Sequence, residues 1–379
     1  MISLADLHWN AIDPVKMMQD LDQPLYFIEN FHVDLVVIPG DYFDSKLPLN
    51  STSAINALQW VDKLIKVCKR NGVLKIRVFK GTEEHDNDQL EALRSREDVD
   101  GYFKIFNYNT YEETLPGLTC LYCPDENINA KDYIMKYYDN IIKRANIGFY
   151  HGSFDVVLPN IVVQMSEETS AKSIIFEYNF WEKMIRGPMI SAHWHDGTII
   201  DNLIYVGTYQ CWAFNEEEEK GMGFIQYNTD NHSYFYKKIP NLRATIYKTL
   251  NVNTLLYTSL DQYASLMRTV DQYLQSDPDM KIRILITIDD DKDENETFIT
   301  SLRQYFMKMN NVKFTIKNTV KAKKKTTQAA KYNELKTKYD FVFNKSSSMY
   351  EKFHDFIQLT QNEDIPIDVI EQTIKKYSK

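Results

Sequence analysis

Five short polar segments, each placed directly after an apolar run, constrain this chain more than any other feature of its sequence. They are Asp6-Leu7-His8, Gly40-Asp41-Tyr42-Phe43-Asp44, Gly81-Thr82-Glu83-Glu84-His85-Asp86, His151 and His193-Trp194-His195. Short apolar runs bounded by turn residues are typical of buried strands. Ligand sites in α/β sheets lie where the carboxyl ends of the strands meet. We therefore expect an α/β fold in which the five segments converge on one site.

The residue types in these segments are those that bind divalent metal ions. The segments supply two aspartates and four histidines, enough ligands for two ions, and one further histidine. The candidates are Asp6, Asp41, His8, His85, His151, His193 and His195. A single histidine is more often structural than a ligand, but five of them at strand ends favour a metal site. Two metal ions about 3.5–4 Å apart can clamp a phosphodiester for in-line attack, which indicates a metal-dependent phosphoesterase.

The spacing within the segments leads to local expectations. The Asp-x-His and His-x-His pairs alternate along what we expect to be extended chains, so both members of a pair should project to one side. Gly40 permits a tight exit from its strand, and Asp41 can bridge two metals through its two carboxylate oxygens. The alternative for Asp41 and Asp44 is a capping role in a turn or helix.

Apolar periodicity divides the chain into four parts, at 1–240, 241–318, 319–345 and 346–379. Strands and helices alternate in the first, a small α+β domain without catalytic residue types follows, then a lysine-rich linker and two amphipathic helices. The expected strands are 33–39, 73–79, 118–124, 146–150, 189–192, 203–206, 281–288 and 312–316. The expected helices are 54–70, 132–145, 260–274 and 298–309, with an acidic turn at 289–296.

Composition indicates the class of protein. With 379 residues, 44% of them apolar and 26% charged, the chain is long enough for two or three globular domains. No apolar run reaches the roughly 18 residues of a membrane span. The N-terminus has neither a basic region nor a cleavage site, so we expect a cytoplasmic protein without membrane contact. Cys120 and Cys123 have the spacing of half a zinc site, but no second pair exists, and we expect reduced core residues.

The net charge of −9 argues against binding nucleic acid by bulk attraction. Local binding stays open, because two bound divalent cations would add four positive charges at the site. The densest basic run, at 321–325, is either a solvated linker or a contact to phosphate.

The order of the motifs resembles that of the calcineurin-like metallophosphoesterases. The finer resemblance is to the SbcD-type (Mre-family) DNA double-strand-break nucleases, including phage versions. Ser3-Leu4-Ala5-Asp6-Leu7-His8-Trp9 is similar to their opening strand, and Gly40-Asp41-Tyr42-Phe43-Asp44 to their second motif. Ile204-Tyr205-Val206-Gly207-Thr208 and the stretch 214–221 resemble the segment that closes the nuclease domain. The resemblance covers about residues 1–240 and continues more loosely beyond.

This resemblance implies a two-sheet α/β sandwich, a small α+β capping domain and a C-terminal helical tail. It also implies two manganese ions, with magnesium as the alternative. The implied ligands are Asp6, His8 and His195 for one ion and His151 and His193 for the other, with Asp41 as the bridge. His85 would not bind metal. It would stabilise the transition state and assist the leaving oxygen, with Asp44 orienting its imidazole.

One position departs from the family pattern. The family has an asparagine before the histidine of the third motif, as a ligand of the second metal, whereas Glu84 precedes His85 here. The glycine of the motif also lies four positions before His85. Glu84 can take the asparagine's place as an oxygen donor. It can equally point to solvent and leave that position to water or Asp86.

The function implied by the resemblance is that of a manganese-dependent nuclease acting in DNA end processing, recombination and repair. It would cut duplex DNA exonucleolytically and single strands endonucleolytically. An SbcC-type ABC ATPase would bind the C-terminal helices, and the chain would form a homodimer through helix 54–70 or helix 132–145. The rivals are another calcineurin-like phosphatase or phosphodiesterase, and a scaffold that has lost activity. Ser45-Lys46 disfavours a phosphoprotein phosphatase, which usually has arginine there, and the retained ligand types disfavour a scaffold.

Overall fold

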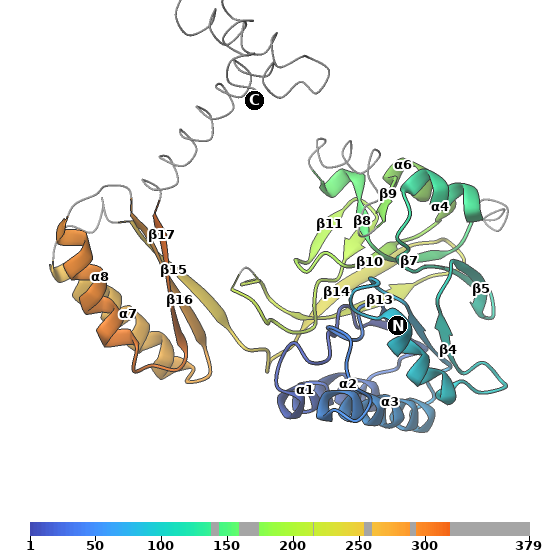
Figure 1. The fold of residues 1–379 in the computed structure, drawn as a ribbon. Coiled ribbons are helices and arrows are strands. Elements are labelled where there is room, and N and C mark those ends of the chain that lie inside the picture. Colours follow the sequence, from blue (N-terminus) through green and yellow to red (C-terminus); the bar gives the residue numbers. More distant parts are fainter. Residues whose placement is uncertain (138–143, 159–173, 215, 254–259, 289–292, 319–379) are drawn as a thin grey trace, which may run out of the picture. The chain divides into compact units, whose positions relative to one another are not determined.

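The computed structural model describes residues 1–137, 144–158, 174–214, 216–253, 260–288 and 293–318 (Figure 1). The chain divides into two compact units. One contains Met1–Thr249 with Gln272–Ile282, and the other contains Leu250–Asp271 with the residues from Arg283 on. The expected linker at 319–345 and the expected helical tail at 346–379 lie outside the described residues.

A six-stranded mixed sheet carries the first three polar segments. Its strand order is β14-β13-β1-β2-β3-β4; the pairs β1–β2, β2–β3 and β3–β4 are parallel, whereas β1–β13 and β13–β14 are antiparallel. The strands are β1 (Ile2–Ser3), β2 (Leu35–Pro39), β3 (Lys75–Phe79), β4 (Phe103–Phe106), β13 (Gly221–Tyr227) and β14 (Tyr234–Pro240). Because β1, β2 and β3 are parallel, the segments that follow them leave the same edge of the sheet.

A second six-stranded sheet carries the other two polar segments. Its order is β11-β12-β10-β7-β6-β5, with the four central strands parallel and both edge strands antiparallel to their neighbours. The strands are β5 (Thr110–Leu115), β6 (Leu118–Cys123), β7 (Ile147–His151), β10 (Met189–Ala192), β11 (Thr198–Ile200) and β12 (Leu203–Tyr205), and the short strands β8 (Ser153–Phe154) and β9 (Ile175–Phe176) pair separately. His151 ends β7 and His193 follows β10, so both lie at one edge.

The inner faces of the two sheets share a core, and helices cover the outer faces (Figure 1). Val37 and Phe79 of the first sheet pack with Tyr122, Phe149 and Ile190 of the second. The first sheet is covered by α1 (Pro14–Asp20), α2 (Asp22–Asn30), α3 (Thr52–Arg70) and the 3₁₀ helix η1 (Asn87–Arg96). The second is covered by α4 (Ala130–Tyr137) and α6 (Tyr178–Met184), with the 3₁₀ turn η3 (Asp155–Val157) nearby in sequence. The expected α/β class is confirmed, as helix, sheet, sheet and helix layers.

Local sequence explains where the longest of these helices begins and ends. Helix α3 follows Ser51, whose Oγ accepts a hydrogen bond from the Ala54 N–H at 3.2 Å. It ends with Lys69 and Arg70 in its last turn, where basic side chains are favoured. Its inner face buries Trp60 and neighbouring apolar side chains against the first sheet.

At two places along the chain the expected elements differ from the structure by more than two residues. The helix expected at 132–145 does not reach Ala145, because Ala145 forms a parallel β-bridge with Ile185 instead. The acidic turn expected at 289–296 is wrong from Asp293 on, because helix α8 (Asp293–Phe306) begins there, and 289–292 lie outside the described residues. Acidic residues are favoured in the first turn of a helix, so the same composition suits a helix start.

A three-stranded sheet with two helices lies within the part of the chain expected to be a small α+β domain. Its strands are β15 (Tyr247–Asn253), β16 (Lys281–Ile288) and β17 (Val312–Asn318), and its helices are α7 (Leu260–Ser276) and α8. Alternate residues of β16, namely Ile282, Ile284 and Ile286, are buried, as are Val270 on α7 and Leu302 on α8. The domain expected at 241–318 stays a prediction.

The four cysteines are buried free thiols, and Cys120 and Cys123 are core residues of β6, as expected. Among the helices of the described ranges, none is both long enough and apolar enough to cross a membrane.

Candidate metal centre

Two glycines allow the strand ends that carry the site to approach one another. Gly40, with φ of +82°, follows β2, and a Cβ at this position would lie 2.1 Å from Nδ1 of His151. A Cβ on Gly81, which follows β3, would lie 2.1 Å from Oδ1 of Asp41. Any side chain at either position would collide with a candidate ligand, so the close approach requires glycine.

Four candidate ligands have left-handed backbone conformations. The φ angle is +48° at Asp6, +46° at His8, +43° at Asp41 and +77° at His193. The expectation that the Asp-x-His and His-x-His pairs lie along extended chains is therefore wrong, because the chain turns after β1 and after β10. Non-glycine residues in this conformation cost about 1–3 kcal/mol each and gather at functional sites.

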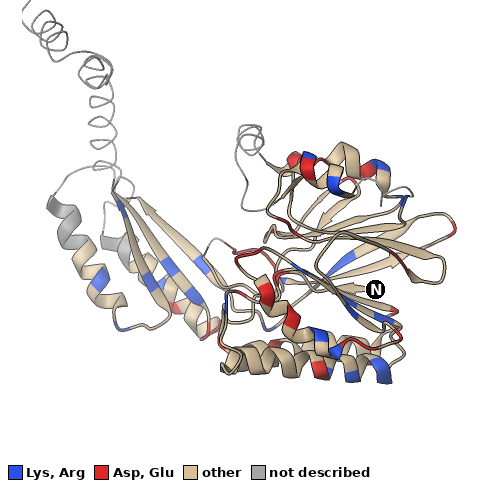
Figure 2. Ribbon diagram, turned by 45° about the vertical axis from the view of Figure 1, so that its right-hand side comes forward, with Lys and Arg blue, Asp and Glu red and all other residues tan. Residues whose placement is uncertain are grey.

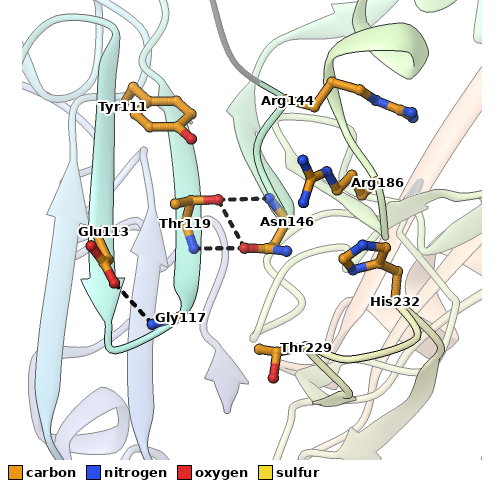
Figure 3. Close-up of a pocket in the computed structure, with 9 residues that line it drawn as sticks. All are labelled: Tyr111, Glu113, Gly117, Thr119, Arg144, Asn146, Arg186, Thr229 and His232. Carbon is orange, nitrogen blue, oxygen red and sulfur yellow. Dashed lines mark hydrogen bonds between the residues drawn. The ribbon is translucent and has the colours of Figure 1, made fainter.

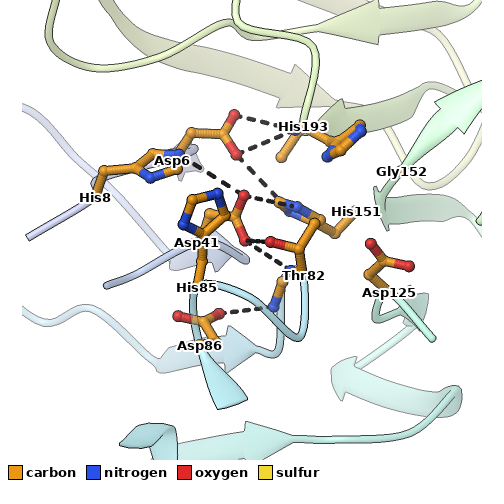
Figure 4. Close-up of polar contacts among 12 residues, drawn as sticks. Asp6, His8, Asp41, Thr82, His85, Asp86, Asp125, His151, Gly152 and His193 are labelled. Carbon is orange, nitrogen blue, oxygen red and sulfur yellow. Dashed lines mark hydrogen bonds and ion pairs between the residues drawn. The ribbon is translucent and has the colours of Figure 1, made fainter. Parts of the chain in front are cut away.

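The polar segments converge on one site, as Figure 4 shows. Potential donor atoms of Asp6, His8 and Asp41 lie within 4.8 Å of one another, and so do those of Asp41, His151 and His193. Asp41 belongs to both groups. The backbone N–H of His193 donates to both carboxylate oxygens of Asp6 at 3.1 Å, which joins the ends of the two sheets. Two adjacent ligand groups with one shared carboxylate suit a pair of divalent ions.

The two carboxylate oxygens of Asp41 have different surroundings. Oδ1 accepts hydrogen bonds from Thr82, from N–H at 2.7 Å and from Oγ1 at 2.9 Å. Oδ2 lies 3.2 Å from Nε2 of His151 and 3.7 Å from Nε2 of His8. One oxygen therefore faces both ligand groups. This geometry favours a bridge through Oδ2 alone over the expected bridge through two oxygens.

The surroundings of the His8 side chain indicate whether these residues are suited to bind a metal ion. Its side chain is 2% exposed, and neither ring nitrogen has a hydrogen-bond partner within the described part of the chain. Its Nδ1 lies 3.4 Å from Oδ1 of Asp44. Buried polar atoms nearly always have a hydrogen-bond partner, so a buried imidazole that lies among carboxylates without a hydrogen bond is suited to bind a metal ion. The mixture of imidazole nitrogen and carboxylate oxygen is a donor set that could hold a divalent metal ion.

His195 lies beside the group formed by Asp6, His8 and Asp41. Its ring nitrogens are not among the donor atoms that lie within 4.8 Å of one another. Its ring centroid is 5.2 Å from that of His8, and Trp212 packs against both rings. Its Nδ1 contacts Oε1 of Glu216 at 2.7 Å. Carboxylate partners of this kind orient metal-binding imidazoles, so Nε2 is the nitrogen of His195 available to an ion.

His85 is half-buried, with its ring centroid 4.5 Å from that of His8. Its Nδ1 contacts the backbone carbonyl oxygen of Asp44, whereas the Asp44 carboxylate lies against His8. Asp44 thus contacts His85, but through its backbone carbonyl and not through its carboxylate. Donor atoms of His8, Asp44 and His85 also lie within 4.8 Å of one another, so proximity by itself permits either a catalytic or a ligand role for His85.

Glu84, the expected substitute for the family's asparagine, has an exposed side chain and lies outside the three groups of potential ligands. The side chain of this segment that donates a hydrogen bond to Asp41 is that of Thr82. Asp86 is fully buried and accepts hydrogen bonds from backbone N–H groups of the loops after β3 and β2, at 2.7 and 3.1 Å. Burial and, secondarily, the charge of Asp41 raise the pKa of Asp86 to about 6. Asp86 therefore ties the two loops together.

The two histidines of the second group carry different charges. Burial disfavours a charged His151, but the carboxylates of Asp41, Asp6 and Asp125 together outweigh burial and raise the pKa of His151 to about 10. Burial and then the charge of His151 lower the pKa of His193 to about 3. The pKa of Asp41 is held well below its usual value, because His151, His8 and His85 together outweigh the effect of burial. At neutral pH the metal-free site thus pairs a charged His151 with an ionised Asp41.

Manganese binding is therefore expected to release about one proton at pH 7, because an ion must displace the proton of His151. Below pH 10 a lower pH favours the protonated imidazole, so the apparent affinity should rise about tenfold per pH unit between pH 6.5 and 8. Calorimetric titrations in buffers of different ionisation enthalpy measure the proton release. His151→Gln should lose it, and a wild-type value of zero would contradict the charge assignment.

Glu84→Ala is expected to leave two manganese ions bound, because the Glu84 side chain is exposed outside the ligand groups. Thr82→Val should instead weaken manganese binding about tenfold, since a hydrogen bond to a charged group contributes about 1.5–3 kcal/mol. Valine preserves the side-chain shape and the backbone N–H. Loss of one anomalous manganese peak in Glu84→Ala, with both retained in Thr82→Val, would reverse the assignment and make Glu84 the ligand.

The sequence motifs did not reveal the roles of three residues. Thr82 and Asp86 lie inside the third polar segment. Only their place after a strand indicated that they could belong to the site. Glu216 lies 21 residues after His195 and comes beside it only in the folded chain. Its one signal was its position in the stretch 214–221 that resembles the closing segment of the family.

The chain matches no protein-family model and no curated protein.

Proposed function

We propose that this protein is a metal-dependent phosphodiesterase of the calcineurin-like type that uses two manganese ions, or magnesium in their place. The observation that supports this most directly is the position of Asp41 Oδ2, 3.2 Å from His151 and 3.7 Å from His8, between two ligand groups. The layered α/β unit with its polar site at the strand ends agrees with the sandwich domain of that superfamily.

Each side chain of the site has a role in this proposal. The ligands are Asp6, His8 and His195 for one ion and His151 and His193 for the other, with Asp41 shared. The bound pair of ions supplies Lewis-acid activation of a water nucleophile and neutralises charge on the phosphate. The carbonyl of Asp44 can only accept, so it keeps a proton on Nδ1 of His85. Nε2 of His85 then faces the substrate, and it would donate a proton to the leaving oxygen from the imidazolium form, in which both ring nitrogens carry protons.

DNA is the proposed substrate, by the resemblance to SbcD-type nucleases. Acidic and basic side chains are interspersed over the helices (Figure 2), and basic residues of α3 are paired, Lys63 with Asp22 and Arg70 with Glu29. Binding would therefore depend on the ions and on local contacts rather than on a broad basic face. An SbcC-type ATPase at the C-terminal helices and a homodimer through α3 or the α4 region are proposed on the same basis.

The chain is expected to cut end-labelled duplex DNA and single-stranded DNA in manganese, and neither in EDTA. The same preparation is tested on bis(p-nitrophenyl) phosphate and on a phosphopeptide. DNA cleavage that requires the metal supports the proposal.

Hydrolysis of the diester alone would keep the phosphodiesterase and reject the DNA substrate. Release of phosphate from the peptide alone would indicate a phosphatase. Absence of all three activities in protein that binds two manganese ions would indicate a scaffold.

A further inference from the structure

A second polar cavity lies at the opposite end of the second sheet (Figure 3). It has a volume of about 410 Å³. Thr119 at the start of β6 and Asn146 just before β7 line it, whereas His151 of the metal centre ends β7. The remaining lining residues are Tyr111, Glu113, Gly117, Arg144, Arg186, Thr229 and His232. The cavity is thus separated from the metal centre by the length of a strand.

Backbone pairing brings two arginines to this cavity. Ala145 and Ile185 form a parallel bridge, and the N–H of Gly187 donates to the carbonyl of Asn146 at 3.0 Å. Side chains alternate along such extended segments, so Arg144 and Asn146 point to the same side, with Arg186 beside them. In Figure 3 both arginines lie on the same side of the cavity as Asn146, across from Tyr111 and Thr119. Arg144 is held in place by its Nη2, which donates to the carbonyl of Ile185 at 2.9 Å.

Neither guanidinium has an acidic partner within the described ranges, unlike other arginines of this chain. The paired ones include Arg70 with Glu29, Arg77 with Glu112, Arg94 with Glu91 and Arg96 with Asp62. Glu113, which lines the opposite wall, accepts a hydrogen bond from the Gly117 N–H at 2.9 Å. In a chain with a net charge of −9, two arginines without an ion-pair partner and one glutamate line this cavity, so its lining has a positive balance.

The floor of the cavity is a fixed network of hydrogen bonds. Oδ1 of Asn146 accepts from N–H and Oγ1 of Thr119, both at 2.8 Å. Its Nδ2 donates to the hydroxyl of Tyr227 at 3.2 Å, and this hydroxyl contacts Nδ1 of His232 at 2.8 Å. The network fixes the imidazole of His232 on the same side of the cavity as Arg186 (Figure 3), so this wall is preformed rather than assembled by a ligand.

We infer that this cavity is a phosphate-binding site distinct from the metal centre, with Arg144 and Arg186 as the groups that bind the phosphate oxygens. Guanidinium groups present paired N–H donors that match phosphate oxygens, which a lysine cannot do. The volume lies within the range of about 300–1,000 Å³ typical of small-molecule sites. The phosphate can belong to a free small molecule or to a nucleic-acid backbone, since both offer the same oxygens.

The experiment uses the intact chain in EDTA, so that metal ions do not contribute to phosphate binding. Equilibrium dialysis measures binding of inorganic phosphate, and fluorescence anisotropy measures binding of a short duplex DNA. The test variant is Arg144→Gln with Arg186→Gln. The control is Lys131→Gln with Lys183→Gln, which removes the same charge from exposed positions on α4 and α6.

The wild type and the control are expected to bind at least one probe with equal affinity, and the arginine variant at least tenfold more weakly. A loss confined to inorganic phosphate identifies a small phosphorylated ligand, and a loss of duplex binding identifies the nucleic-acid backbone. Equal binding by the arginine variant and the control, or no saturable binding of either probe by the wild type, would overturn the inference. The four substituted side chains are exposed, and thermal melting confirms that each variant is folded.

Discussion

Replacing Asp41 with alanine is expected to abolish manganese binding and DNA cleavage together. Its Oδ2 faces both ligand groups, so one substitution removes a ligand from each ion. Loss of an outer partner of a metal ligand already costs about 10–100-fold in affinity, and loss of the shared ligand should exceed this range. Calorimetric titration with manganese and cleavage of labelled duplex DNA measure the two effects on one preparation.

Two further variants make the Asp41 result interpretable. Breaking a buried ion pair can cost about 3–5 kcal/mol, so Asp41→Ala can fail through misfolding, because it removes the partner of His151. Asp41→Asn preserves the volume and an acceptor for Thr82, and should fold while losing both activities. Asp88→Ala removes an exposed aspartate and should change neither. Undiminished manganese binding by folded Asp41→Asn would show that Asp41 is not the shared ligand.

His85→Asn is expected to lower kcat by about 10²–10⁴-fold, the range of general acid–base catalysis, while manganese and DNA affinities change only a few-fold. His85 lies beside the first ligand group, and its Nδ1 is already engaged by the carbonyl of Asp44. Its remaining nitrogen is available to a substrate oxygen. Calorimetry and single-turnover cleavage at saturating manganese separate binding from catalysis.

The matched control for His85 is His32→Asn, because His32 is 80% exposed and precedes β2, whereas the site follows the carboxyl end of that strand. This control should cleave DNA at the wild-type rate. If His85→Asn loses manganese as fully as Asp41→Asn, then His85 is a ligand together with His8 and Asp44, and its catalytic role is rejected.

Regular elements and the edge that carries the site could be predicted, because both follow from short-range patterns. β10 and β16 begin and end at the predicted residues, and α3 begins two residues before its predicted start. Parallel strands place their carboxyl ends at one edge, so apolar runs followed by polar residues were enough to indicate where the ligands meet.

The detailed geometry of the site could not be predicted, because it depends on contacts between distant segments. The N–H of His193 meets the carboxylate of Asp6 across 187 positions of the sequence. An Asp-x-His pair also has the same spacing whether its chain is extended or turned, so the left-handed conformations of Asp6 and His8 left no signal. The engagement of Asp41 Oδ1 by Thr82 likewise depends on how closely the loops after β2 and β3 approach.

Anomalous diffraction from manganese-loaded crystals tests the central claim most directly. The account predicts two manganese peaks about 3.5–4 Å apart, one beside Asp6 and His8 and the other beside His151 and His193, with Asp41 Oδ2 between them. A single peak, or two peaks that do not share Asp41, would contradict it.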